Sequence, residues 1–107
     1  MHPTVWQIAL EYKGMLLNLY GNDLAELVLY GSYARGDQHE ESDIDFAIVL
    51  HNSSIRTAAE IARIAPLSSR LWLKHGLVVS SLPVSLCKLQ ASMQGLYQNI
   101  RREGIPV

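Results

Sequence analysis

The sequence lacks the features typical of disulfide-bonded proteins, of membrane or secreted proteins, and of general nucleic-acid-binding proteins. A single cysteine, Cys87, excludes a disulfide within the chain, and we interpret it as a small apolar filler rather than a reactive thiol. No apolar run approaches the length of a membrane span, and the first residues lack the basic and apolar regions of a signal peptide. The formal net charge of −1 gives no indication of the basic face that general nucleic-acid binding normally needs. We therefore expect a cytoplasmic protein without membrane contact and without general affinity for nucleic acid.

Apolar residues, in contrast, are plentiful. They make up 49% of the 107 residues, which is enough to build a core in a chain of this length. A disordered chain would be poorer in apolar residues and more charged. We expect one domain spanning residues 1–107, with no room for a second.

Apolar spacing predicts an alternation of helices and strands. The expected order is helix, strand, turn, strand, helix, strand, helix, which is typical of a small α/β or α+β domain with a short mixed sheet packed against helices. Trp6 and Trp72 lie on the helical segments, where we expect them to be packing anchors. The first expected helix follows an N-cap at Thr4. The second covers 55–75, with a kink or break at Pro66 and an end at Gly76, and the third covers 85–99. The expected strands cover 26–30, 43–50 and 77–82.

A glycine-serine turn follows the first expected strand. Gly31 and Ser32 interrupt the apolar run that ends at Tyr30 and open a short helical turn. Backbone N–H groups exposed at such a turn suit a phosphate group, and the Ser32 hydroxyl can add a hydrogen bond. A glycine-serine pair alone is usually only a turn, so this feature depends on its neighbours.

Two carboxylates open the second expected strand. Asp43 and Asp45 are two residues apart, and side chains at this spacing share one face of a strand. Two anionic oxygen ligands are what Mg²⁺ favours when substrate phosphates complete its coordination shell. Together with the turn, the pair predicts metal-assisted transfer from a nucleoside triphosphate.

The order of these motifs resembles a known signature. Gly31-Ser32, then Arg35-Gly36, then Asp43-Ile44-Asp45 is similar to the signature of the DNA polymerase β-like nucleotidyltransferase superfamily, and the small size resembles its minimal nucleotidyltransferase branch. The ending Arg101–Ile105 also resembles endings found in this branch. The resemblance implies a polymerase-β-like fold and an antitoxin encoded beside a small helical HEPN-domain toxin.

The resemblance also implies roles for individual residues. Gly31 and Ser32 would hold the triphosphate of ATP or another nucleotide, and Asp43 and Asp45 would hold Mg²⁺ for displacement at the α-phosphate. Arg35 is a candidate phosphate clamp, because a guanidinium group matches phosphate geometry. A salt-bridged arginine beside Asp37 or Glu40 is an equally good interpretation of Arg35.

One feature departs from this signature. Family members usually carry a third carboxylate on a later strand, whereas the expected strand 77–82 has no Asp or Glu and offers only Ser80 and Ser81. Serine is neutral and a much poorer ligand for Mg²⁺. Nucleotide binding is therefore a firmer expectation than fast catalysis.

Two functions remain open from the sequence. The first is an enzyme that transfers AMP from ATP to a hydroxyl, which by analogy with the branch is a tyrosine of a HEPN-type toxin; a small-molecule acceptor is a variant. The second is a catalytically impaired antitoxin or nucleotide sensor that acts by occlusion. The helix bearing Met93 and Leu96 and the Arg101-Arg102 pair are candidate partner contacts.

Three further side chains have a possible place at the site. His39 and His51 could lie near its mouth, although surface histidines without a role are the commoner case. Tyr33 could contact a nucleobase.

Overall fold

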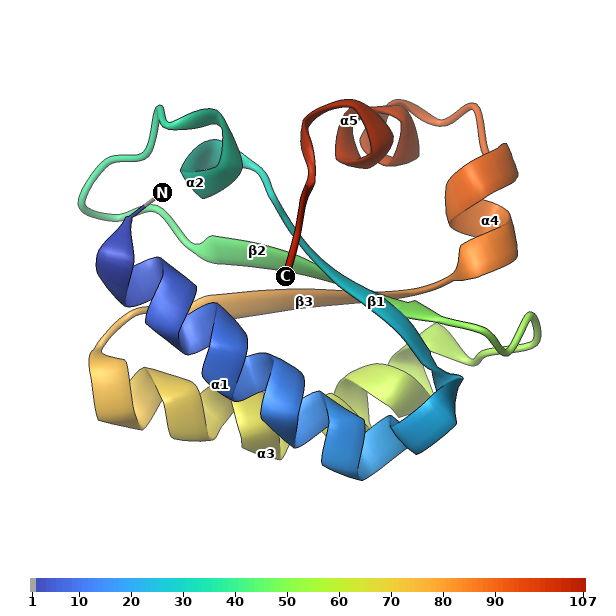
Figure 1. Ribbon diagram of the computed structural model, residues 1–107, viewed down its shortest axis with the longest axis horizontal. Helices are drawn as coiled ribbons and strands as arrows, with labels where there is room; N and C mark the ends of the chain where they lie inside the picture. The colour runs from blue at the N-terminus through green and yellow to red at the C-terminus, as the bar shows by residue number, and fades with distance from the viewer. Residues whose placement is uncertain (1) are drawn as a thin grey trace.

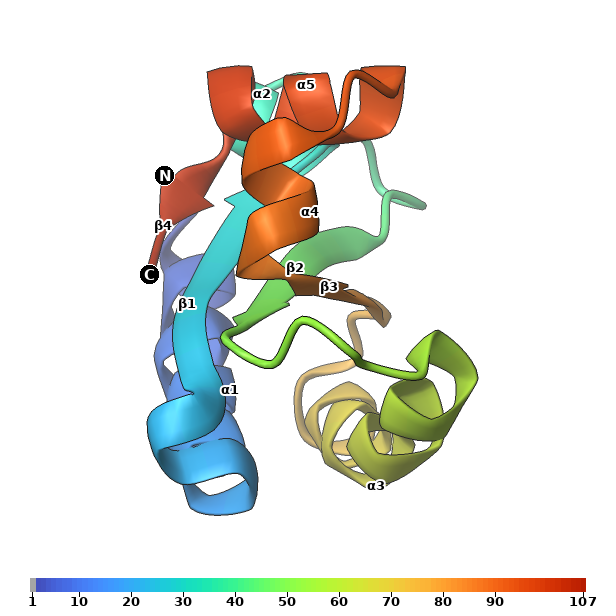
Figure 2. The ribbon, with the colours of Figure 1, turned by 90° about the vertical axis from the view of Figure 1, so that its right-hand side faces the viewer.

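The computed structural model describes residues 2–107 and has three layers, with a four-stranded sheet between two layers of helices (Figures 1 and 2). The mixed α/β architecture predicted from the sequence is confirmed. Within the described residues, no helix is both long enough and apolar enough to cross a membrane. The elements in chain order are α1 (Pro3–Tyr20), the 3-10 turn η1 (Gly21–Asp23), β1 (Leu24–Tyr30), α2 (Ser32–Arg35), β2 (Ile44–Leu50), α3 (Thr57–His75), β3 (Val79–Ser85), α4 (Leu86–Ala91), α5 (Gly95–Glu103) and β4 (Ile105–Pro106).

The strands are arranged in the order β3-β2-β1-β4. β1 is antiparallel to β2 and to β4, whereas β2 and β3 run parallel because the long helix α3 connects them. β2 lies between β1 and β3, and six of its seven residues are buried. β3 is an edge strand, which is where Pro83 is tolerated since a proline cannot donate a hydrogen bond to a neighbouring strand.

Side chains alternate between the two faces of the sheet and build two cores. On one face, Leu29, Phe46 and Ile48 pack with α1 and α3. On the other, Ala47 and Val49 pack with α4 and α5, which Figure 1 shows on the side of the sheet away from α1 and α3. The period of two along β2 therefore decides which face each residue of this strand takes.

The start of α1 and the effect of Pro66 on α3 differ from the prediction. α1 begins at Pro3 rather than after Thr4, and the His2 ring accepts a hydrogen bond from the Val5 N–H. Pro66 does not break α3, because Ile64 and Leu71 anchor the helix in the core on both sides of it. α3 ends at Gly76, as predicted.

The carboxyl-terminal part of the chain differs most from the prediction. The single helix expected over 85–99 is two helices, α4 and α5, because the chain becomes extended at Ser92 and at Gln94. The Arg101 guanidinium donates to the carbonyls of Leu89 and Ser92, so it stabilises the end of α4 rather than forming a free basic patch. β4 was not predicted, since two residues are too few to form a pattern.

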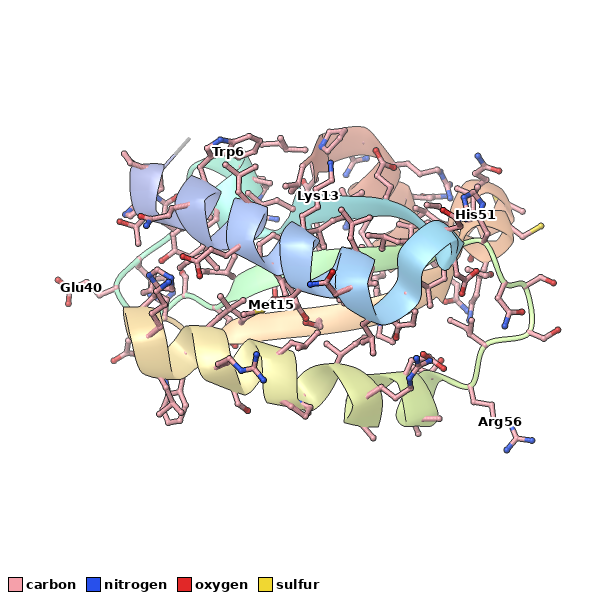
Figure 3. The ribbon with its side chains drawn as sticks, turned by 60° about the horizontal axis from the view of Figure 1, so that its bottom comes forward. Trp6, Lys13, Met15, Glu40, His51 and Arg56 are labelled. Atoms are coloured by element: carbon pink, nitrogen blue, oxygen red, sulfur yellow. The ribbon has the colours of Figure 1, made fainter. Side chains whose placement is uncertain are left out.

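Both tryptophans lie on helix surfaces rather than in the core. Trp6 is 38% exposed and Trp72 is 52% exposed, so the prediction of packing anchors was wrong for both. Figure 3 shows Trp6 on the outer side of α1. Periodicity predicted the helices correctly, but it could not decide how wide an apolar face each helix buries.

Candidate functional site

The two sequence motifs meet at one open hollow at the start of β2. Its volume is about 470 Å³. Four residues singled out from the sequence line it, namely Ser32, Arg35, Asp43 and Asp45. Its other lining residues come from the loop between α2 and β2; they are Asp37, His39, Glu41 and Ser42.

Gly31 brings the backbone of the turn against the Asp45 carboxylate. Its φ of 76° and ψ of −154° lie in a region that is essentially restricted to glycine. A Cβ at this position would overlap the Asp45 carboxylate oxygen and would lie 3.2 Å from its Cγ. The antiparallel pairing of β1 with β2 causes this approach, because it sets Tyr30 opposite Asp45 and so places the next residue, Gly31, over the carboxylate.

The two carboxylates have different environments. Asp43 precedes β2 and is exposed, whereas Asp45 lies within β2 and is half-buried. Burial raises the pKa of Asp45, the negative charge of Asp43 raises it further, and the positive charge of Arg35 opposes both effects. A cation bound between the two carboxylates would therefore reduce their mutual repulsion.

The donor set fits a metal only in combination with a ligand. Within residues 2–107, no group of three or more His, Cys, Asp or Glu side chains could hold a metal ion by itself. Mg²⁺, however, commonly takes one or two protein carboxylates and completes its octahedral shell with phosphate oxygens and water. Asp43 and Asp45 thus suit a metal–nucleotide complex better than a free ion.

Strand register shows which serine of β3 lies on the same face of the sheet as Asp45. In the parallel pair β2–β3, Asp45 lies beside Ser80, so these two side chains share a face of the sheet. Ser81 faces the opposite side, where its hydroxyl forms a hydrogen bond of 2.5 Å with the Tyr12 hydroxyl. Ser80 is therefore the serine on the face of Asp45, and Ser81 belongs to the packing of β3 against α1.

Arg35 is at the hollow and is also ion-paired. Its Nε lies 3.0 Å from an Asp37 carboxylate oxygen, and its Nη1 lies 3.0 Å from Glu103 Oε1. Hydrogen bonds to Asp37 and then to Glu103 raise the pKa of Arg35, so the guanidinium is always charged. A salt bridge to Asp37 or Glu40 was predicted as an alternative to a phosphate contact, and the structure forms the one to Asp37. The pairing with Glu103 was not predicted.

The loop lining the hollow is the part of the site that sequence reasoning largely missed. The His39 N–H donates to the Ser42 hydroxyl oxygen at 2.9 Å, the Ser42 N–H donates to the His39 carbonyl at 3.0 Å, and the Glu41 N–H donates to His39 Nδ1 at 3.2 Å. These bonds hold the loop in a compact turn. Two sequence signals pointed to this loop: Ser42 directly precedes the Asp-x-Asp pair, and His39, expected near the mouth of the site, does line the hollow.

The other two side chains considered from the sequence lie away from the hollow. His51 follows the far end of β2, and Figure 3 shows it at the opposite end of the sheet from Glu40, which belongs to the loop beside the site. Tyr33 is only 8% exposed and packs in the core, with its ring edge-on to His2. His51 at the mouth of the site and Tyr33 against a nucleobase were therefore wrong predictions.

A match to a protein family model shows to which family this chain belongs. The family model described as polymerase beta, nucleotidyltransferase matches residues 17–107, which include both motifs. The chain belongs to the polymerase beta nucleotidyltransferase family. The family expected from the Gly-Ser and Asp-x-Asp motifs is thereby confirmed.

Two relatives with similar sequences are both named as candidate protein adenylyltransferases. A candidate protein adenylyltransferase of Methanocaldococcus jannaschii is 34% identical over 76 residues, which are 71% of this chain and 75% of the relative. A second candidate protein adenylyltransferase of the same organism is 35% identical over 72 residues, or 67% of this chain and 65% of that relative.

Solved structures with the same fold include toxin–antitoxin complexes. One such complex with AMP-PNP is 26% identical, with a TM-score of 0.56 over 89% of this chain and 68% of the other. A mutant of the toxin–antitoxin pair MntA-HpeT is 27% identical, with a TM-score of 0.54 over the same fractions. A candidate nucleotidyltransferase from Sulfolobus solfataricus is 17% identical, with a TM-score of 0.68 over 96% and 78%, which confirms the fold.

Proposed function

We propose that this nucleotidyltransferase is an antitoxin that transfers AMP from ATP to a hydroxyl group of a partner toxin. The observation that carries the proposal is the approach of the Gly31 turn to the Asp45 carboxylate, in a hollow that also contains Asp43, Ser32 and Arg35. This places groups suited to a triphosphate directly beside groups suited to its metal.

The reaction is an in-line displacement at the α-phosphorus. The acceptor hydroxyl loses its proton as its oxygen bonds to that phosphorus, the bond to the bridging oxygen of the β-phosphate breaks, and pyrophosphate leaves. When bound, Mg²⁺ would neutralise the charge that develops on the phosphoryl oxygens. Asp43 and Asp45 would hold the metal, the Gly31–Ser32 turn would position the triphosphate, and Arg35 would contact its phosphate oxygens.

The proposed acceptor is a tyrosine of a helical, HEPN-type toxin. Two relatives bear the name of protein adenylyltransferases, and two solved neighbours are toxin–antitoxin complexes, one of them with an ATP analogue. The open hollow gives little surface with which to hold a small free acceptor. A protein partner would supply the missing positioning area through its own interface.

A second function is favoured by β3. Ser80 stands where the third carboxylate of the family is expected, and a neutral hydroxyl cannot replace its charge. The alternative is therefore an antitoxin or sensor subunit that binds nucleotide and acts by occlusion. A small-molecule nucleotidyltransferase is the remaining variant of the enzymatic function.

Calorimetric titration with ATP and Mg²⁺ tests the proposal. We expect the double variant Asp43→Asn plus Asp45→Asn to lose metal-dependent ATP binding while it still unfolds cooperatively, because both anionic ligands are gone. Glu26→Gln plus Glu40→Gln removes the same charge outside the hollow and should bind ATP normally. Undiminished binding by the Asp43/Asp45 double variant would refute the proposed site.

Mass spectrometry of the toxin after incubation with ATP separates the two functions. A gain of one or more AMP groups that requires Asp43 and Asp45 supports the enzyme. Normal ATP binding without any gain supports the antitoxin that acts by occlusion.

A further inference from the structure

Arg35 connects the hollow to the carboxyl-terminal part of the chain. It is the last residue of α2, and it pairs with Asp37 in the adjacent loop and with Glu103 at the end of α5. Glu103 is 68 positions away in sequence, so this contact exists only because the fold brings α2 beside α5 (Figures 1 and 2).

The two ion pairs leave three of the five N–H donors of the guanidinium free for a ligand. Arginine has five N–H donors in a rigid plane, and these pairs use Nε and one donor of Nη1. Within residues 2–107, no other acceptor is hydrogen-bonded to Arg35. Because Arg35 lines the hollow with Asp43 and Asp45, its remaining donors are available to a phosphate group there.

Glu103 is the better anchored of the two carboxylates. Its side chain is 19% exposed, against 60% for Asp37, so solvent screens its interaction with Arg35 less. The chain continues from Glu103 into β4, where Ile105 pairs with Leu29 of β1, the strand that ends at the Gly31 turn. Glu103 and the phosphate-binding turn are thus both positioned by β1.

We propose that Glu103 is a positioning residue, which fixes the Arg35 guanidinium so that its remaining N–H donors meet the triphosphate of the bound nucleotide. This inference rests on the proposed function, because it assigns Arg35 a phosphate contact. If Glu103 acted only through its charge, its mutation would have the opposite effect. Removing a negative charge near the hollow would then strengthen the binding of an anionic nucleotide.

Titration of the full chain with ATP and Mg²⁺ tests the inference. Glu103→Gln preserves the shape of the side chain and removes its charge; we expect its Kd for ATP to rise roughly threefold to tenfold as a charge-assisted hydrogen bond becomes neutral. Arg35→Ala should weaken binding by at least as much, and Glu103→Gln should add nothing in the Arg35→Ala background. Unchanged or tighter binding by Glu103→Gln, or an equal loss in both backgrounds, would overturn the inference.

A matched control lies on the other side of the sheet. Glu60 pairs with Arg63 at 3.0 Å, and the exposures of the two side chains, 15% and 49%, are close to those of Glu103 and Arg35. We expect Glu60→Gln to bind ATP like the wild type. A loss equal to that of Glu103→Gln would show a general effect of losing an ion pair and would overturn the inference.

Two further variants keep the test decisive. Arg35→Lys retains the charge but not the planar fork, so it should also weaken ATP binding, and full binding would refute a role for guanidinium orientation. If Asp43→Asn plus Asp45→Asn leaves ATP binding intact, the proposed function fails, which is distinguishable from a failure confined to Glu103.

Discussion

Asp45 is a carboxylate whose charge opposes folding. Burial and the neighbouring Asp43 raise its pKa in the folded protein above the ordinary value of 3.8. The folded state therefore holds the Asp45 proton more tightly than the unfolded state does. The stabilisation from this proton is complete below the ordinary pKa and is lost as the pH rises through the raised pKa of the folded state.

This pH dependence predicts that Asp45→Asn stabilises the protein at pH 7. Urea denaturation at pH 7 and at about pH 3 would measure it, since the gain should shrink once Asp45 is protonated in both states. Glu40→Gln removes an exposed charge from the neighbouring loop and should change the free energy of unfolding by less than about 0.5 kcal/mol. If Asp45→Asn is less stable than the wild type at pH 7, the charge of Asp45 is compensated in the fold.

Gly31 is the second residue on which the site depends. Gly31→Ala should cost about 2–3 kcal/mol of stability, because its backbone conformation is essentially restricted to glycine and the new Cβ would displace the Asp45 carboxylate. ATP binding should be lost with it. Urea denaturation and calorimetry would measure the two effects.

Gly36 provides the control for Gly31. Its φ is also positive, at 84°, but nothing lies within 4 Å of a Cβ placed there. Gly36→Ala should therefore cost only about 1 kcal/mol and should leave Asp45 in place. Equal losses of ATP binding in both variants would show that the overlap with Asp45 is not what makes Gly31 necessary.

At the scale of elements, the register of β3 against β2 determines which serine, when replaced by Asp, would place a carboxylate on the face of Asp45. Ser80→Asp would add a carboxylate on the face of Asp45, and we expect it to raise the rate of AMP transfer at least about tenfold, which corresponds to about 1.4 kcal/mol of transition-state stabilisation. Mass spectrometry of the toxin over time would follow the rate.

Ser81→Asp is the matched control one residue along the strand. It places the new carboxylate on the opposite face and removes the hydrogen bond to Tyr12, so it should cost roughly 1–3 kcal/mol of stability without any gain in rate. If wild-type transfer is already fast and Ser80→Asp does not increase it, the site is complete without a third carboxylate.

At the scale of the whole molecule, exposed apolar side chains occur on both sides of the sheet. Met93 and Leu96, 77% and 45% exposed, lie on the α4–α5 side, which is also the side of Asp45. Trp72 and Leu73, 52% and 78% exposed, lie on α3 on the other side. An acceptor hydroxyl that reaches Asp45 must approach on its own side of the sheet, so Met93 and Leu96 are the expected toxin contacts.

Co-expression with the proposed toxin partner, followed by size-exclusion chromatography, would test this contact. We expect a complex for the wild type, a weaker one for Met93→Ser plus Leu96→Ser, and a normal one for Trp72→Ser plus Leu73→Ser. Loss of two apolar contacts should weaken binding by about 2–4 kcal/mol. Two separate wild-type peaks at micromolar concentration, without rescue from toxicity, would contradict the antitoxin function.

Most residues of the candidate site could be brought together from the sequence because they are close in it. The Gly31–Ser32 turn and the Asp43–Asp45 pair are separated by one short loop, and alternation along a strand is enough to place both carboxylates on one face. Apolar patterns likewise predicted α1, α3 and the first three strands, because a helix buries one face at a regular spacing and a buried strand forms a short apolar run.

Tertiary structure alone decided the contacts between elements that are distant in sequence. Sequence left Ser80 and Ser81 as alternatives, and the pairing of β3 with β2 distinguished them, since a shift by one residue reverses the face. The division of α4 from α5, the pairing of β4 and the ion pair between Arg35 and Glu103 depend on how the chain returns to β1. No local pattern encodes such contacts, because their energy comes from groups that meet only after the sheet has formed.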